Sequence, residues 1–351
     1  MMENALYRED VAYAANLLLP WEKLAGKSVL ITGASGLIGS FLIDVLMAKN
    51  AQSLNCRIYA VGRSQKRAEE RFAGYWKSPL FEFIAHDINE PLKLEDVSRV
   101  DFVVHLASNT HPVAYATDPI GTVTANIIGT DNLLKVAVQH GAERFAFASS
   151  CEIYGENRGD TELFQESYCG YIDSNTLRAG YPESKRCGEA LCQAYKKQKG
   201  LDIVIPRFAR TYGPTMLKTD TKALSQFMKR ALEGENIVLK SAGTQYYSYT
   251  YVADAVAGFL TILLKGENGE AYNIADEVSD IRLKDLADII AGIAGRDVVF
   301  ELPDETEKAG YSKATKARLD GSKLKMLGWT AKYDIRQGVE RTMALLAAQE
   351  L

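Results

Sequence analysis

The sequence has few of the residues that build disulfide frameworks and metal centres. Its 351 residues include five cysteines and four histidines, and neither set shows paired ligand spacing. We therefore expect no metal site, and reduced thiols of the kind found in cytoplasmic proteins. No apolar run is long enough to cross a bilayer, and residues 1–20 carry acids and polar side chains throughout, so we expect neither a membrane span nor a signal peptide.

An excess of positive charge is also missing. The chain has 41 lysines and arginines against 45 aspartates and glutamates, which gives a formal net charge of −4. This balance provides no basic field, so we expect neither nucleic acid nor an anionic membrane as a partner. A hydrophobic content of 47% and a charged content of 25% are typical of a soluble globular protein with a substantial core.

The most informative stretch is a glycine-rich turn between a strand pattern and a helix pattern. Ser28–Thr32 is a short β-branched run, and Gly33, Gly36 and Gly39 follow at intervals of three before an apolar-periodic segment. Such a turn lets the backbone approach a pyrophosphate, and the helix that opens at Gly36 directs its unpaired N–H groups at the anion. A turn that only packs closely is the alternative, but the flanking elements favour a nucleotide cofactor.

Strand patterns and helix patterns alternate along the rest of the first part of the chain. This alternation predicts an α/β fold, a doubly wound parallel sheet of the Rossmann type with helices on both faces. The expected strands are Arg57–Val61, Phe81–Ala85, Phe102–Leu106, Arg144–Ala148 and Ile203–Pro206, and the longest expected helices are Thr122–Val138 and Tyr181–Lys199.

The pattern changes after Pro206, which indicates a second, smaller α/β domain over the carboxyl edge of the sheet. We expect a dinucleotide-binding domain over 27–208 and 246–276, in which Tyr249–Val252 returns to the main sheet. The second domain is expected over 209–245 and 277–351. Residues 1–26 are expected to form a helical extension that acts as a packing arm or an oligomer contact.

Two tyrosines of the expected helix Tyr181–Lys199 have a lysine one turn later. Tyr181 precedes Lys185 by four residues, and Tyr195 precedes Lys199 by four, so each pair shares a helix face. A neighbouring cation favours the phenolate and would make the tyrosine a usable base. Because helices of a parallel sheet begin at the edge where the cofactor lies, Tyr181 is the catalytic candidate and Tyr195 is expected at the surface.

Polar residues also follow the expected strand Arg144–Ala148 at the same edge. Ser150 can hydrogen-bond a substrate hydroxyl or carbonyl, and Glu152 is a carboxylate in position to act as a base or an acid. Serine and glutamate at a strand end are also common turn formers and caps, so this pattern leaves both interpretations open.

Taken together, these motifs resemble those of extended short-chain dehydrogenases/reductases, specifically the NAD(P)-dependent nucleotide-sugar epimerases, dehydratases and decarboxylases. The resemblance runs from about Ser28 to Trp329 and is nearest in pattern to UDP-glucuronate decarboxylase. Its motifs are Gly33–Gly39, Asp87–Ile88, His105–Ser108, Asn126–Thr130, Ser150–Gly155, Arg178–Lys185, Thr211–Pro214, Tyr251–Asp254 and Leu327–Trp329.

The resemblance implies a cofactor site and makes the second domain the nucleotide-sugar-binding domain. Asp87 and Ile88 would flank the adenine, and Lys185 would bind the nicotinamide ribose. The other implied contacts of the cofactor are Gly33, Ser35, Gly36, Leu37, Ile38, Gly39, Arg63, Leu106, Ala107, Ser108, Asn126 and Tyr181.

The resemblance also implies the chemistry. Tyr181 would take the proton of a sugar hydroxyl, usually at C4, while hydride passes to the nicotinamide, and Ser150 would contact the reacting oxygen. The resulting 4-ketone acidifies the neighbouring C–H and makes a β-carboxylate a good leaving group, so that dehydration, decarboxylation or inversion becomes easy before the hydride returns. Glu152 matches the residue that removes the C5 proton in dehydratases and that decarboxylases also possess.

Four positions depart from the family pattern. Cys151 stands where the dehydratases most often have aspartate, and a thiol is the weaker acid. Tyr247 replaces an arginine that commonly pairs with the substrate diphosphate, and Arg210 replaces an asparagine. We expect Arg210 and Lys222 to supply that positive charge, or Arg210 to pair with an acid instead. Arg63 stands where NAD-selective members have an acid and would suit a 2′-phosphate, which favours NADP over NAD, although an arginine can also stack on adenine.

The leading prediction is therefore an enzyme that modifies a nucleotide-diphosphate sugar through a transient 4-keto intermediate, of the decarboxylase or 4,6-dehydratase type. A 4-epimerase is the alternative, and a non-catalytic cofactor-binding subunit is a further one. The two long helices resemble those that pair between subunits in this family, so we expect a homodimer.

Overall fold

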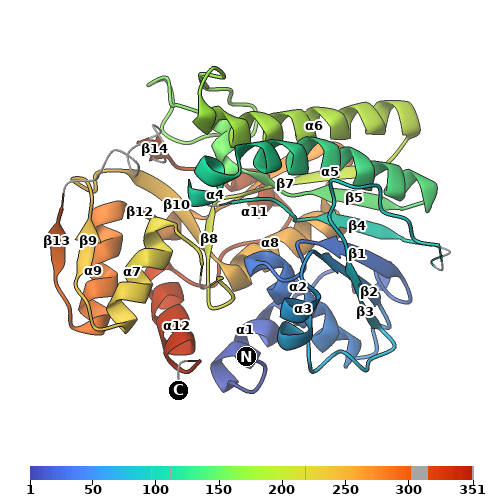
Figure 1. Cartoon of the computed structure of the whole chain (residues 1–351), viewed down its shortest axis with the longest axis horizontal. Coiled ribbons are helices and arrows are strands. Elements are labelled where there is room, and N and C mark those ends of the chain that lie inside the picture. The colour runs from blue at the N-terminus through green and yellow to red at the C-terminus, as the bar shows by residue number, and fades with distance from the viewer. Residues whose placement is uncertain (96, 98, 111, 218, 302–314, 350–351) are drawn as a thin grey trace.

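A single parallel sheet organises the larger part of the molecule (Figure 1). The computed structural model describes residues 1–95, 97, 99–110, 112–217, 219–301 and 315–349, and within these ranges the main sheet has eight strands. Each pairing in it is parallel, which confirms the expected α/β architecture. Its order is β11 (Glu270–Ile274), β7 (Ile203–Phe208), β5 (Arg144–Phe147), β4 (Phe102–His105), β1 (Ser28–Thr32), β2 (Arg57–Gly62) and β3 (Phe81–Ala85), with β6 (Ser149–Ser150) paired to β7.

Helices cover both faces of this sheet (Figure 1). Alternate residues of each strand are buried on opposite faces, and Leu30 joins a different core cluster from Val29 and Ile31. One face carries α5 (Pro119–Gln139) and α6 (Gly180–Lys199), and the other carries α2 (Leu37–Asn50) and α8 (Val252–Lys265). The shorter helical segments near the sheet are α3 (Gln65–Arg71), α4 (Pro112–Thr117), η1 (Trp21–Lys23), η2 (Cys151–Tyr154) and η3 (Leu177–Ala179).

A second, smaller unit lies at one end of the main sheet (Figure 1). It contains a four-stranded sheet of β8 (Arg210–Tyr212), β10 (Tyr246–Tyr251), β12 (Asp280–Arg282) and β14 (Lys316–Ala317), and a pair made by β9 (Ile237–Leu239) and β13 (Val298–Phe300). Its helical segments are α7 (Ala223–Leu232), η4 (Glu277–Ser279), α9 (Leu283–Ala294), α11 (Ser322–Met326) and α12 (Ile335–Ala347).

The small sheet corrects one sequence-based expectation. Tyr249–Tyr251 of the strand expected over Tyr249–Val252 lie in β10, whereas Val252 begins α8. Strand β10 pairs with β8, β12 and β14 rather than with the main sheet. The chain returns to the main sheet only afterwards, through α8 and β11. The expectation was wrong because the run of aromatic and β-branched residues identifies a strand without identifying its neighbour.

The N-terminal extension forms helix α1 (Ala5–Ala15), which packs within the molecule against α2 and α8. Its buried face presents a polar side chain at each turn. The Tyr7 hydroxyl donates to Asp44 of α2 at 2.5 Å, and the Tyr13 hydroxyl donates to Asp254 of α8 at 2.9 Å. Asp10 accepts from the Tyr251 hydroxyl at 2.6 Å. The extension thus packs against the rest of the chain. Within the described residues, no helix combines the length and apolarity that a membrane span needs.

Candidate active site

The glycine-rich turn lies at the carboxyl edge of the main sheet, between β1 and α2. Gly33 has a φ of 68°, and a Cβ there would lie 2.8 Å from the Ala107 nitrogen. A Cβ on Gly39 would lie 2.4 Å from the Gly33 oxygen, so the tight geometry requires both glycines. The N-cap of α2 is Gly36, which provides no side-chain cap. The first turn therefore keeps N–H groups that suit a pyrophosphate. Half-buried around it are Ser35, Leu37, Ile38, Leu106 and Ser108.

The residues predicted for the adenosine end lie at the carboxyl ends of β2 and β3. Arg63 is exposed directly after β2. Asp87 is exposed after β3, and its carboxylate accepts from the Asn89 backbone at 3.0 Å. Ile88 is buried, and its side chain lies where a Cβ on Gly129 of α5 would be, at 2.7 Å. Arg63 and Ile88 thus follow two neighbouring strands of the sheet, one exposed and one buried.

Asn126 of α5 is fully buried where this helix packs against α6. Its amide nitrogen donates to the Ser184 hydroxyl at 3.0 Å and to the Thr122 oxygen at 3.1 Å. In the described part of the chain its Oδ1 atom has no hydrogen-bond partner. Asn126 therefore joins the start of α6 to α5, and one acceptor at this junction stays open.

Tyr181 and Lys185 share one face at the start of α6, as their spacing predicts, and both are buried. Burial raises the pKa of the Tyr181 phenol, and a hydrogen bond with Ser150 acts in the opposite direction. The Lys185 ammonium lies 6.0 Å from the centre of the Tyr181 ring and donates to the Ala148 oxygen at 2.7 Å. Burial lowers the pKa of Lys185 to about 7. Burial, rather than the neighbouring cation, therefore dominates the titration of the phenol here, which differs from the sequence-based expectation.

Glu152 lies between two guanidinium groups. Its Oε2 accepts from Arg178 at 2.6 Å, and its Oε1 lies 3.8 Å from Arg210. The backbone nitrogen of Glu152 donates to the Ser150 hydroxyl at 3.2 Å. Arg210 also donates to the Cys151 sulfur at 3.8 Å, and burial raises the pKa of that thiol. The predicted catalytic residues of this strand end therefore form one cluster with two positive charges and one negative charge.

Two members of this cluster had no role in the sequence-based prediction. Tyr115 of α4 stacks on Tyr181, with ring centres 4.9 Å apart and an interplanar angle of 28°. The guanidinium of Arg178 lies 4.9 Å from the centre of the Tyr115 ring. Within the described residues, the Nε and Nη1 atoms of Arg178 are buried without a hydrogen-bond partner. Arg178 stands inside a motif and was recognisable from it, whereas no local signal distinguishes Tyr115 among the 18 tyrosines.

The three predicted substrate contacts are distributed over β8, β10 and the start of α7. The Arg210 guanidinium lies 3.5 Å from the centre of the Tyr247 ring, so these two residues form one stacked unit. Lys222 is half-buried before α7 and pairs with Asp220 at 3.1 Å. The structure thus brings Arg210 and Tyr247 to the Glu152 cluster. In the ranges described, no three histidine, cysteine, aspartate or glutamate side chains are grouped to hold a metal ion.

Comparison with known proteins identifies the relatives of this chain. Residues 29–275 match the model of the NAD dependent epimerase/dehydratase family. UDP-glucuronic acid decarboxylase 6 of Arabidopsis thaliana is 33% identical over 312 residues, which cover 89% of this chain and 86% of the relative. UDP-glucuronic acid decarboxylase 1 of Xenopus tropicalis is 33% identical over 319 residues, which cover 90% of this chain and 71% of the relative.

Solved structures show the same fold at lower identity. A dTDP-glucose 4,6-dehydratase double mutant from Streptomyces venezuelae with bound NAD superposes with a TM-score of 0.78 at 24% identity, covering 90% of this chain and 96% of that one. UDP-glucuronic acid 4-epimerase from Bacillus cereus, in complex with UDP-glucuronic acid and NAD, gives a TM-score of 0.77 at 24% identity, covering 92% of this chain and all of the other. From the family match and the decarboxylase relatives, the chain belongs to the NAD-dependent epimerase/dehydratase family.

Proposed function

We propose that this enzyme oxidises a nucleotide-diphosphate sugar at C4 and then decarboxylates or dehydrates the 4-keto intermediate before reducing it again. The observation that carries the proposal is the meeting of Ser150, Tyr181 and Lys185 with Glu152 at the sheet edge that also holds the glycine-rich turn. A non-catalytic subunit would need none of these side chains in a common cluster.

Each side chain of the cluster has a separate role in the oxidation step. A bound dinucleotide supplies the acceptor for a hydride and later returns it. Once deprotonated, Tyr181 accepts the proton of the sugar hydroxyl, and Ser150, which counters the effect of burial on the pKa of the phenol, holds the reacting oxygen. Lys185 contributes positive charge beneath the phenol and binds ribose hydroxyls. The Tyr115 ring on the phenol excludes water from this proton transfer.

The charge of the cluster favours a sugar acid as the substrate. Arg178 pairs with Glu152 through Nη2 only, and within the described residues its buried Nε and Nη1 atoms have no hydrogen-bond partner, so its positive charge can also meet an anionic group of the sugar. A carboxylate on C5 matches this charge, and it is a good leaving group once C4 is a ketone. Decarboxylation therefore ranks before 4,6-dehydration. A 4-epimerase would use the same three residues without needing the acid at Glu152.

Further expectations concern the ligands and the assembly. The exposed Arg63 supports binding of a 2′-phosphate and hence of NADP, and Arg210 and Lys222 stay our prediction for the substrate diphosphate. A homodimer through α5 and α6 is supported by Ile120 and Ile128, whose exposed fractions are 77% and 46%. The five free cysteines are consistent with a cytoplasmic enzyme.

A screen of UDP-, dTDP-, GDP- and CDP-sugars, including their uronates, with mass analysis of the product tests this function. Loss of carbon dioxide is the expected result. Loss of water would instead assign a dehydratase, and a product of unchanged mass an epimerase. Failure of the protein to bind NAD or NADP and to convert any of these sugars would overturn the proposal.

A further inference from the structure

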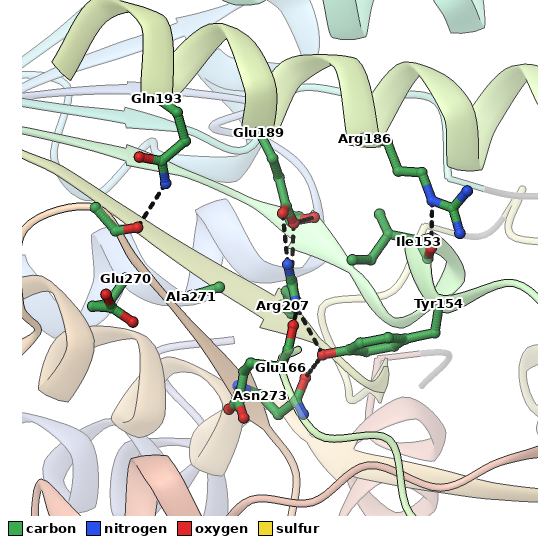
Figure 2. Close-up of polar contacts among 12 residues, drawn as sticks. Ile153, Tyr154, Glu166, Arg186, Glu189, Gln193, Arg207, Glu270, Ala271 and Asn273 are labelled. Atoms are coloured by element: carbon green, nitrogen blue, oxygen red, sulfur yellow. Dashed lines mark hydrogen bonds and ion pairs between the residues drawn. The ribbon is translucent and has the colours of Figure 1, made fainter. Parts of the chain in front are cut away.

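A largely buried ion pair joins Glu189 of α6 to Arg207 of β7 (Figure 2). Arg207 donates from Nε to Glu189 Oε1 at 2.9 Å and from Nη2 to Glu189 Oε2 at 2.7 Å. The side chains are 9% and 14% exposed. This two-pronged geometry is the strongest form of arginine–carboxylate pairing. Glu189 lies one turn after Lys185 on the same helix, so the pair adjoins the catalytic residues without belonging to them.

Two side chains of helix α6 form hydrogen bonds with two consecutive residues that directly precede Ser150. Lys185 donates to the Ala148 oxygen at 2.7 Å, and the Ser149 hydroxyl donates to Glu189 Oε1 at 2.5 Å. The next residue is Ser150. One turn of α6 thus fixes the backbone immediately before Ser150, which lowers the pKa of the Tyr181 phenol against the effect of burial. A shift of Glu189 would move the Ser149 side chain and with it the backbone next to Ser150.

Arg207 anchors this arrangement on its far side (Figure 2). Its Nη1 atom donates to the Glu166 oxygen at 2.6 Å and to the Tyr154 hydroxyl oxygen at 3.0 Å. The Tyr154 hydroxyl in turn donates to Asn273 of β11 at 2.6 Å. Since these partners come from separate segments, Arg207 holds Glu189 in one position relative to the sheet.

The surroundings of Lys185 contain little other charge. From α6 itself, Tyr181, Glu189 and the Cys192 thiol face it, and β5 contributes the ring of Phe147 at 4.9 Å. Beside it on β4 lies His105, whose pKa burial lowers to about 3, so its imidazole is neutral. Glu189 is therefore the anion that offsets the cost of burying the ammonium, with the Arg207 guanidinium on its opposite side.

We propose that Glu189 is a positioning residue that keeps Lys185 protonated and holds the Ser149–Ser150 backbone in place for proton transfer. This inference rests on the proposed function, because it concerns the same catalytic site. Without the Glu189 charge, the ammonium lacks a group that raises its pKa, so it loses its proton at a lower pH. Since burial already lowers the pKa of Lys185 to about 7, the change falls within the working pH range.

The test compares the pH dependence of kcat for the wild type, Glu189→Gln and Glu189→Asp. Activity needs the ammonium, so it declines as the pH rises through the pKa of Lys185. In Glu189→Gln we expect this decline about one pH unit lower than in the wild type. In Glu189→Asp, which keeps the charge, we expect it at the wild-type pH with a lower kcat.

A matched control exists at the other end of the sheet. Asp202 accepts from Arg144 Nε at 2.8 Å and from Arg144 Nη2 at 3.1 Å, in the same two-pronged geometry. Asp202→Asn should lower the melting temperature and leave the pH at which kcat declines unchanged. If Glu189→Gln does not fold because Arg207 is left unpaired, the double variant Glu189→Gln/Arg207→Gln removes that charge, and the decline should still move to lower pH.

The outcomes separate the two proposals. An unchanged pH of decline in a folded Glu189→Gln protein, or in the double variant, overturns the role of Glu189 even though the wild type turns over a sugar nucleotide. An equal shift in Asp202→Asn overturns it as well, because the effect would then follow stability alone. A wild type that is inactive on all the sugars screened refutes the proposed function itself.

Discussion

Polar and charged residues lie at both edges of the main sheet, but their hydrogen bonding differs between the two edges. At the amino edge, Asp101 accepts from the Ser28 nitrogen at 2.8 Å, from the Ser28 hydroxyl at 2.9 Å and from Arg99 at 2.5 Å. At the carboxyl edge, Arg178 and Asn126 keep buried polar atoms that have no partner within the described residues. Because buried polar groups are normally paired, the paired atoms of Asp101 indicate a structural role, and the unpaired atoms at the carboxyl edge are where we expect a ligand to bind. Variants at each edge test whether the amino edge serves stability and the carboxyl edge serves catalysis.

The largest expected effect follows from removing the phenol oxygen at the carboxyl edge. We expect Tyr181→Phe to lower kcat about a thousandfold, because the sugar hydroxyl loses its base. Tyr195→Phe, at the other end of the same helix, removes a hydroxyl bonded to Asp131 at 2.7 Å and should leave kcat unchanged. Steady-state kinetics on the sugar found in the screen measures both, and an equal loss in the two variants would contradict the assignment.

Glu152→Gln should lower turnover about a hundredfold. The amide keeps the shape but removes the negative charge between Arg178 and Arg210. Because the 4-ketone forms at Tyr181, oxidation of the sugar should continue, and reduced cofactor should accumulate in rapid-mixing absorbance measurements. Wild-type turnover in Glu152→Gln would show that this acid has no part in the chemistry.

Arg210→Asn should raise the KM for the sugar nucleotide about tenfold and change kcat little, because the lost guanidinium binds the substrate in every state of the reaction. Arg230→Asn is the control, since it removes a guanidinium of α7 that pairs with Glu235 at 3.6 Å outside the site, and it should give a KM near that of the wild type. A fall in kcat at constant KM would instead place Arg210 in the chemical step.

The smallest effect on activity is expected at the amino edge. Hydrogen bonds from Ser28 and Arg99 outweigh the burial of Asp101 and lower the pKa of its carboxyl. A carboxyl whose pKa is lower in the folded state than in the unfolded state stabilises the fold at neutral pH. This stabilisation is lost as the pH falls through the folded-state pKa. Asp101→Asn should therefore cost about 2 kcal/mol of unfolding free energy at neutral pH and less in acid, with kcat unchanged. Chemical denaturation at the two pH values checks this, and a large loss of kcat would weaken the contrast between the edges.

Local patterns were sufficient for much of the fold and for part of the site. The strand patterns recur in β1 to β5 and β7, and the spacing of Tyr181 and Lys185 places both on one buried face. These features depend on residues within a few positions of one another, where the periods of strand and helix hold. The alternation of strands and helices likewise predicts a parallel sheet, whose carboxyl edge gathers the strand-end residues.

Contacts between distant segments were not accessible in this way. Tyr115 stacks on Tyr181 from a separate helix, and β10 pairs with β8, β12 and β14 instead of the main sheet. The charge of Arg210 was noted from the sequence, but its stacking on Tyr247 and its approach to Cys151 were not. Each of these depends on packing between elements, which no local period encodes.

The parallel sheet, the glycine-rich turn and the start of α6 were predictable from the amino-acid sequence alone, because each depends on backbone geometry over a few neighbouring residues. Contacts between distant segments place Glu152 between two arginines and let Glu189 pair with Arg207 while it accepts from Ser149. The physical reason is that charge and burial depend on which segments meet. In this chain, burial by the surrounding segments changes the pKa values of Tyr181 and Lys185 more than the spacing of the two residues does.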